Sequence, residues 1–130
     1  MNHEPDNLSS YGDSLKDCLI SSASIHGAKK AISFFREGSL ETEISYLELD
    51  RDSNRMANTF LNLGVSKGDR VVLYIPKSLF FVIAHVALQK IGAVGVPLNP
   101  GFKKWEMSYL LGDADARLIV SGPEQEAVVK

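Results

Sequence analysis

Residues 70–100, RVVLYIPKSLFFVIAHVALQKIGAVGVPLNP, contain two short apolar runs separated by a segment of helical length. The first run, residues 71–75, is continuously apolar and ends at Pro76. Continuous rather than alternating apolarity is typical of a strand that is covered on both faces. The second run, residues 94–98, follows Gly92, which is a typical residue at a helix end. This stretch therefore predicts a β-α-β unit with parallel strands.

The helix expected between these strands begins after Ser78, a capping residue, and runs to about Ile91. It is apolar nearly all round, with only His85, Gln89 and Lys90 clearly polar. A helix with one face on a sheet and the other in water is polar over about half of its circumference. We therefore expect protein on both sides of this helix. Its second covering layer is expected to come from sequence outside these 130 residues, or from self-association through an exposed apolar face.

The α/β alternation continues toward the C-terminus. A helix is expected over about residues 103–111, with an apolar stripe formed by Met107, Leu110, Leu111 and Ala114. Residues 118–120 are predicted as a third strand, and residues 121–124 as the start of another helix. The C-terminal part is thus predicted as a β-α-β-α-β unit with a parallel sheet.

The N-terminal part predicts a helix followed by a hairpin. Residues 1–12 are expected to form a flexible tail, and Asp13 or Ser14 to cap a helix that runs to about Ile25 and ends before Gly27. One face of that helix carries Leu15, Cys18, Leu19 and Ser22. Residues 31–36 and 41–44 are predicted as two strands, with residues 37–40 as the turn between them.

The second helix has a strong local start signal. Ser45 and Glu48 have the spacing of a capping box, in which the hydroxyl accepts from the Glu48 N–H and the carboxylate accepts from the Ser45 N–H. Ile44 and Leu49 are placed for a hydrophobic staple around this cap. The helix then continues with apolar residues at helical spacing and closes at Gly64; these residues are Leu49, Met56, Phe60 and Leu63.

Composition excludes several classes of function. The net charge is −2 and 23% of the residues are charged, so the chain lacks the excess of basic residues that is typical of nucleic-acid-binding proteins. The longest apolar run, residues 79–88, is interrupted by His85 and is too short for a transmembrane segment. The polar N-terminus is not a secretory signal, and a single cysteine, Cys18, allows no internal disulfide. These features indicate a cytoplasmic protein.

The residues themselves present no catalytic, cofactor-binding or metal-ligating group. Residues 64–68 have glycines and a lysine in the wrong order for a phosphate loop. His85 is interpreted as a core or interface histidine, since no nucleophile or carboxylate partner can be named, and Cys18 as a small buried apolar residue. Trp105 and Tyr109, one helical turn apart, are expected to pack rather than to bind a ring.

Three segments together resemble the adenylate-forming superfamily of acyl-CoA synthetases, luciferases and adenylation domains. Residues 44–49 are similar to its first core motif, and residues 88–100 to its second. The connecting residues 63–71 also resemble the sequence pattern that the family has between these two motifs. The resemblance covers about residues 30–121. The ending Pro97-Leu98-Asn99-Pro100 looks most like acyl-CoA synthetases. By this resemblance, residues 13–130 are a partial N-terminal subdomain, and the fold is α/β: an N-terminal helix and hairpin, then the parallel-sheet unit, within a larger layered domain.

The resemblance implies an AMP-forming ligase of the kind used in fatty acid metabolism. Such an enzyme converts a carboxylate, ATP and CoA, with Mg²⁺, to acyl-CoA, AMP and pyrophosphate. The family's phosphate loop, its Mg²⁺-associated acidic residue and its mobile lysine have no match here, so the segment by itself is expected to bind no cofactor and to be inactive. Many members have a basic residue directly after Asn-Pro, where Gly101 stands in this chain. Lys103 and Lys104 lie close by, and whether either contacts CoA is left open.

A second interpretation is a stand-alone binding or interaction module of flavodoxin-like type. Such a module binds its ligand at the carboxyl ends of its strands. The loops at those ends are residues 76–78 and 99–102. Ligand binding by the isolated chain distinguishes the two interpretations.

Overall fold

The computed structural model describes residues 14–129. The expected tail over residues 1–12, and Asp13 as an alternative cap, lie outside the described residues. The chain forms two compact units, residues 1–52 and residues 53–130. Each unit is described by itself below.

Helix α1 spans Leu15–His26 in the first unit. Ser14 is its cap, with the Oγ atom accepting from the Asp17 N–H at 3.1 Å. The predicted stop at Gly27 is confirmed, since Gly27 is the residue that follows the helix. Along α1 only Ala23 is fully buried, and Leu15 is 58% exposed, so the face proposed from the sequence is covered only in part.

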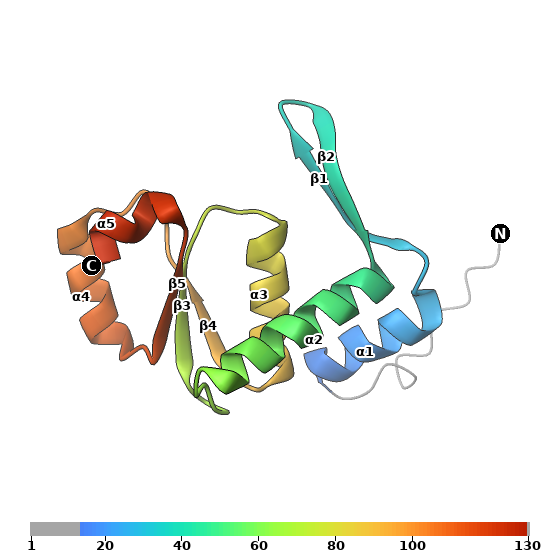
Figure 1. Cartoon of the computed structure of the whole chain (residues 1–130), viewed down its shortest axis with the longest axis horizontal. Helices are drawn as coiled ribbons and strands as arrows, with labels where there is room; N and C mark the ends of the chain where they lie inside the picture. Colours follow the sequence, from blue (N-terminus) through green and yellow to red (C-terminus); the bar gives the residue numbers. More distant parts are fainter. Residues whose placement is uncertain (1–13, 130) are drawn as a thin grey trace. The chain divides into compact units, whose positions relative to one another are not determined.

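The hairpin consists of β1, Lys30–Arg36, and β2, Ser39–Ser45, which pair in antiparallel fashion (Figure 1). The prediction of a four-residue turn over 37–40 is wrong, because Arg36 pairs directly with Ser39. Glu37 and Gly38 have φ of 51° and 79°, and two successive left-handed residues form the tight turn whose twist matches paired strands. The strands are therefore longer than the apolar pattern indicated.

Helix α2 spans Tyr46–Asn62 and crosses the boundary between the two units. The Ser45 Oγ atom accepts from the Glu48 N–H at 3.1 Å, which confirms one half of the capping box, while the return contact of the Glu48 carboxylate stays a prediction. Ile44 and Leu49, the proposed staple, are both buried.

The end of α2 is a complete Schellman motif. Gly64 has φ of 90°, its N–H donates to the Leu61 oxygen, and the Val65 N–H donates to the Phe60 oxygen. Phe60 and Val65 are both 2% exposed and belong to one core cluster. Leu63 was expected on the apolar face of the helix, but it lies beyond the helix end and is 59% exposed, because the left-handed turn brings Val65 into the core instead.

Three parallel strands form the sheet of the second unit. They are β3, Arg70–Tyr74, β4, Val94–Pro97, and β5, Leu118–Ser121, in the order β4-β3-β5. The central strand is covered on both faces, as its continuous apolarity predicts. Val71 and Leu73 join one core cluster, and Val72 and Tyr74 join the other.

Helices cover both faces of this sheet (Figure 1). Residues of α2 and of α3, Leu79–Lys90, pack in the cluster of Val71 and Leu73. Residues of α4, Lys104–Ala114, and α5, Glu126–Val129, pack in the cluster of Val72 and Tyr74, and a short 3-10 turn, η2, Pro123–Gln125, precedes α5. Helix α4 thus begins one residue later and ends three residues later than the sequence indicated.

Helix α3 is covered mainly on its sheet side. Its start is capped as predicted, with the Ser78 Oγ atom accepting from the Phe81 N–H at 3.2 Å. Ala84, Ala87 and Leu88 are fully buried, whereas Phe80 is 48% exposed. Five further apolar residues of the helix are half-buried, namely Leu79, Phe81, Val82, Ile83 and Val86. The helix therefore carries more apolar surface than the described residues cover.

The predicted fold class is confirmed: an N-terminal helix, an antiparallel hairpin and a parallel three-stranded sheet with interleaved helices. Between residues 14 and 129, no helix has the combination of length and apolar character that crossing a bilayer requires.

Candidate functional site

The carboxyl ends of β3 and β4 meet at one edge of the sheet, since the two strands are parallel neighbours. A pocket of about 410 Å³ lies at this edge and is lined by Ile75, Lys77, Phe81 and residues 97–100. The loops 76–78 and 99–102, identified from the sequence as candidate ligand loops, therefore both contribute to one pocket. In open α/β sheets this is the edge at which ligands bind.

The loop after β4 is held in shape by Asn99. The Gly101 N–H donates to Asn99 Oδ1 at 2.8 Å, and the Phe102 N–H donates to the Asn99 carbonyl oxygen at 3.0 Å. From the central strand, the Tyr74 hydroxyl donates to the Phe102 carbonyl oxygen. A side chain at Gly101 would place its Cβ atom 3.2 Å from Asn99 Oδ1, which is a tight contact. The packed loop therefore favours the glycine found at the position after Asn-Pro.

Lys103 and Lys104 are exposed at the start of α4. Lys103 is the N-cap residue of α4, and its backbone N–H donates to Glu106 Oε1 at 3.3 Å, so the Glu106 carboxylate satisfies this N–H at the helix start. Neither lysine lines the pocket at the carboxyl edge, and a contact of either with CoA stays an open prediction.

Lys77 is the one ionisable residue among those that line this pocket. It was noted only as a member of a loop, because a single exposed lysine after a strand resembles any solvated lysine. Its position directly after the central strand was the available signal, since that strand contributes to the carboxyl edge.

The other residues considered from the sequence do not line this pocket. His85 is half-buried on α3, and its ring centroid is 6.2 Å from that of Phe81. Cys18 is half-buried on α1 and is a free thiol. In the first unit, Ser45 is buried as the cap of α2, which fits the structural role predicted for it, and Tyr46 has a ring contact with His26.

The expectation that Trp105 and Tyr109 pack is wrong. Their exposed fractions are 73% and 74%. Helix α4 buries Met107, which lies about 200° around the helix from each of them, so both aromatic rings are on the solvent side.

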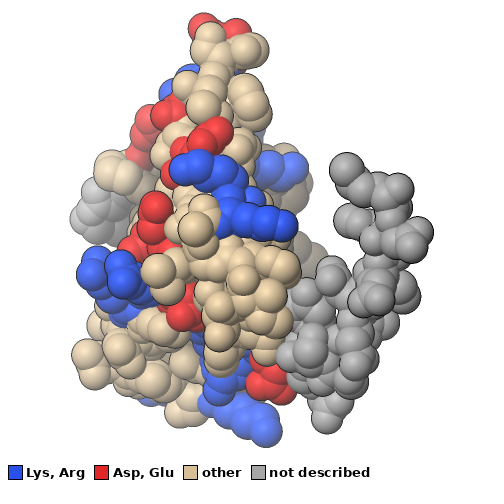
Figure 2. All heavy atoms as spheres, turned by 90° about the vertical axis from the view of Figure 1, so that its right-hand side faces the viewer, with Lys and Arg blue, Asp and Glu red and all other residues tan. Residues whose placement is uncertain are grey.

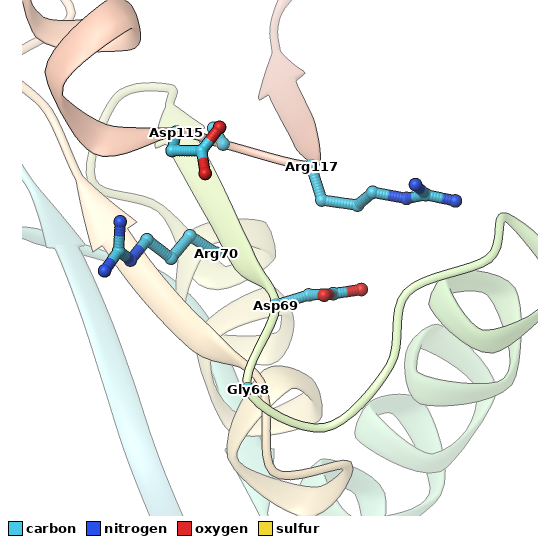
Figure 3. A pocket seen from close by; sticks show the side chains of 6 residues that line it. Gly68, Asp69, Arg70, Asp115 and Arg117 are labelled. Atoms are coloured by element: carbon cyan, nitrogen blue, oxygen red, sulfur yellow. The ribbon is translucent and has the colours of Figure 1, made fainter.

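A second and larger pocket, of about 610 Å³, lies at the opposite, amino edge of the sheet (Figure 3). The two turns that form it are joined by a hydrogen bond from the Arg117 N–H to the Arg70 carbonyl oxygen at 2.8 Å. Asp69, Arg70, Asp115 and Arg117 line it, together with Gly68 and Ala116.

The charged groups of this amino-edge pocket already have structural contacts. Arg70 Nη1 donates to the Ala114 carbonyl oxygen at the end of α4, at 2.9 Å, and Asp69 Oδ2 accepts from the Ser66 N–H at 2.7 Å. Arg117 Nη2 lies 3.3 Å from where a Cβ atom of Gly64 would be, beside the end of α2. Cations at helix C-termini are stabilising, so the two arginines link the ends of α4 and α2 to the sheet, whereas Asp69 holds the turn before β3.

Charged side chains are dispersed rather than gathered on the face drawn in Figure 2. Basic and acidic side chains alternate there with uncharged surface. Within residues 14–129, no three His, Cys, Asp or Glu side chains come together as metal ligands would.

The family model described as AMP-binding enzyme matches residues 21–130 of the chain. The chain belongs to this family. Among its relatives is the crotonobetaine/carnitine–CoA ligase of Escherichia coli O1:K1 / APEC, 34% identical over 113 residues, which are 87% of this chain and 22% of the relative.

Solved structures of AMP-binding enzymes have the same fold. The N-terminal domain of FACL13 from Mycobacterium tuberculosis matches with a TM-score of 0.81 and 26% identity, over 91% of this chain and 29% of that one. The Mycobacterium tuberculosis fatty acyl CoA synthetase matches with a TM-score of 0.76 and 28% identity, over 85% and 22%. The chain thus spans about a fifth of the length of the ligases that it matches.

Proposed function

We propose that this chain is part of an ATP-dependent acyl-CoA ligase and forms the first layer of its adenylate-forming domain. The observation that carries the proposal is the similarity of nearly the whole chain to CoA ligases, in sequence and in fold. The reaction joins a carboxylate to CoA with cleavage of ATP to AMP and pyrophosphate. We place this activity in the cytoplasm and in the metabolism of fatty acids or related carboxylic acids.

The chemistry of such a ligase solves one problem: a carboxylate is a poor electrophile. Transfer of AMP to the carboxylate gives it a good leaving group, which the CoA thiol then displaces, and cations offset the phosphate charge when they are bound. ATP, Mg²⁺ and CoA are implied by the family for the full-length enzyme. The described residues would serve as the scaffold and as part of the wall of the acyl or CoA cavity, at the carboxyl edge of the sheet.

The remainder of the enzyme would also complete the cover of α3. Phe80 is 48% exposed, and the apolar residues beside it on the helix are half-buried. Large exposed apolar surface is rare on an independent soluble domain. In isolation, the chain is expected to bind a hydrophobic dye and to associate at high concentration, through the same surface.

Replacement of the matching 113-residue segment of the Escherichia coli ligase by this chain tests the proposal. The chimaera should release pyrophosphate from ATP when the carboxylate is present, and it should form a thioester, with release of AMP, only when CoA is present as well. A chimaera with Leu88→Asp, a charge in the fully buried core, is the matched inactive control.

Calorimetry on the isolated chain tests the alternative of a stand-alone binding module. The proposal predicts no tight binding of ATP or CoA, and micromolar binding of either, or of a flavin, would contradict it. Stable monomers at high concentration with no dye binding would also count against it.

A further inference from the structure

We propose that the β1–β2 hairpin takes up a third strand along the free edge of β1, and that this strand comes from the part of the ligase outside these 130 residues. The inference rests on the proposed function, because the rest of the ligase supplies the strand.

The hairpin is a sheet of only two strands. Among the described residues, β1 and β2 pair with each other and with no third strand. Residues 31–36 take part in no further backbone hydrogen bond within the described part of the chain. A two-stranded hairpin is at best marginally stable in water, and the unpaired N–H and C=O groups along its edges are a template for another strand.

The side chains of β1 indicate that both of its faces are to be covered. Phe34 and Phe35 are neighbours in a strand and therefore point to opposite faces of the hairpin. Phe34 is half-buried, together with Ile32 on the same face, whereas Phe35 is 65% exposed. Leu40, which pairs with Phe35 across the hairpin, is 51% exposed. A strand that is apolar on both faces is typical of the interior of a layered domain.

The pairing distinguishes the two edges of the hairpin. Glu41 in β2 has no partner in β1, because Phe34 pairs with Thr42 and Phe35 pairs with Leu40. Such a bulge is one of the features that keep an edge strand from pairing further. β1 has no extra residue between positions 32 and 36, which gives five successive residues for a third strand. The edge of β1 is therefore the one that fits an added strand.

The rest of the ligase is the partner that the observations favour. The chain spans 22% of the length of the Escherichia coli relative, so most of the protein that could cover this edge lies outside the chain. A second copy of the chain is disfavoured. Antiparallel pairing of β1 with itself about Ser33, at the middle of the strand, would place Lys30 opposite Arg36 of the other copy, and like charges directly opposite are destabilising.

The turn determines which backbone groups face the free edges. Arg36 and Ser39 flank the two-residue turn, and in turns of this type the flanking residues are a hydrogen-bonded pair. Since bonded and non-bonded pairs alternate in antiparallel strands, the next pair, Phe35 and Leu40, is a non-bonded one. The Phe35 N–H therefore points to the free edge of β1, and the Leu40 N–H to the free edge of β2.

Hydrogen exchange resolved to single amides tests the inference, on the isolated chain and on the chimaera with the Escherichia coli ligase. The Phe35 amide should exchange at least about tenfold more slowly in the chimaera, the factor expected for one additional backbone hydrogen bond. The Leu40 amide should exchange at the same rate in both proteins. The inference is overturned if the Phe35 amide also exchanges equally fast in both.

Phe35→Pro removes the N–H at the free edge of β1 without removing a bond between the two strands, and proline is tolerated at such edge positions. Leu40→Pro is the matched control, since it makes the same change on the opposite edge at the same residue pair. In the chimaera, Phe35→Pro should return the exchange of residues 32–34 to the rate of the isolated chain, and Leu40→Pro should not. Equal effects of the two prolines would contradict the choice of edge, and the comparison of the Phe35 amide decides the inference even where a proline variant loses the hairpin.

The two proposals can fail separately. An active chimaera with an unprotected Phe35 amide overturns the added strand and leaves the ligase assignment standing. An inactive chimaera with a protected Phe35 amide supports the added strand and contradicts the ligase activity.

Discussion

Truncation of Leu88 to alanine should remove a large part of the stability of the sheet unit. Leu88 is fully buried on the sheet side of α3, in the cluster that contains Val71 and Leu73. Its Cδ1 atom lies 3.5 Å from where a Cβ atom of Gly95 in β4 would be, so the leucine fills the space beside that glycine. The variant leaves a cavity between helix and strand.

The expected cost is about 2–5 kcal/mol, the range for Leu→Ala at fully buried sites. Domains of this size are stable by about 5–15 kcal/mol, so the change is a large fraction of the whole. Urea unfolding followed by circular dichroism measures it as a lower midpoint with an unchanged slope.

Leu63→Ala is the matched control, because it makes the same chemical change at a leucine that is 59% exposed. It should alter the free energy of unfolding by no more than about 0.5 kcal/mol. Gly95→Ala alone should be neutral or slightly stabilising, and in combination with Leu88→Ala it should recover about 0.5–1 kcal/mol by filling part of the cavity. The packing argument is refuted if Leu88→Ala costs no more than Leu63→Ala.

Three further predictions concern local features. Gly92→Ala should cost about 1 kcal/mol in urea unfolding, because Gly92 has φ of 72°, and equal stability of this variant and Gly95→Ala would contradict that reason. Ser78→Ala should cost about 1 kcal/mol through loss of the α3 cap, measured against Ser108→Ala on exposed α4 surface; equal effects would refute the capping role. Gln125→Met should raise the midpoint of thermal unfolding, because the buried Oε1 atom of Gln125 has no hydrogen-bond partner among the described residues. An unsatisfied buried acceptor costs about 1–3 kcal/mol of stability. A lower midpoint would show that the amide has a partner.

The features that the sequence predicted well depend on neighbouring residues. Ser78 and Gly92 mark the start and the end of α3, and each does so through contacts with residues a few positions away along the chain. The continuous apolarity of residues 71–75 reports the burial of β3 on both faces, because each side chain must suit its own surroundings. Helix ends and strand burial of this kind can therefore be predicted without knowledge of the tertiary structure.

The features that it did not predict join distant positions. Lys90, expected to be simply polar, is 7% exposed and donates to Asn54 Oδ1 at 2.9 Å across 36 residues. The bonds from Tyr74 to Phe102 and from Arg70 to Ala114 span 28 and 44 residues. No local sequence pattern specifies such partners. For the same reason the sequence did not predict the lining of the carboxyl-edge pocket, which comes from two loops that α3 separates along the chain.

Helix α3 shows how a mismatch between sequence and burial becomes informative. If the sheet unit were the helix's whole environment, selection would favour polar residues on the side away from the sheet. Val82, Ile83 and Val86, which are turned away from the fully buried Leu88, instead keep that side apolar, although all three are only half-buried. Exposed apolar area of this extent disfavours solubility and adds nothing to the stability of the unit. Its presence is explained when a further layer of the ligase covers it. A chimaera in which Val82, Ile83 and Val86 are made polar should keep the fold of the sheet unit while losing assembly with the rest of the enzyme.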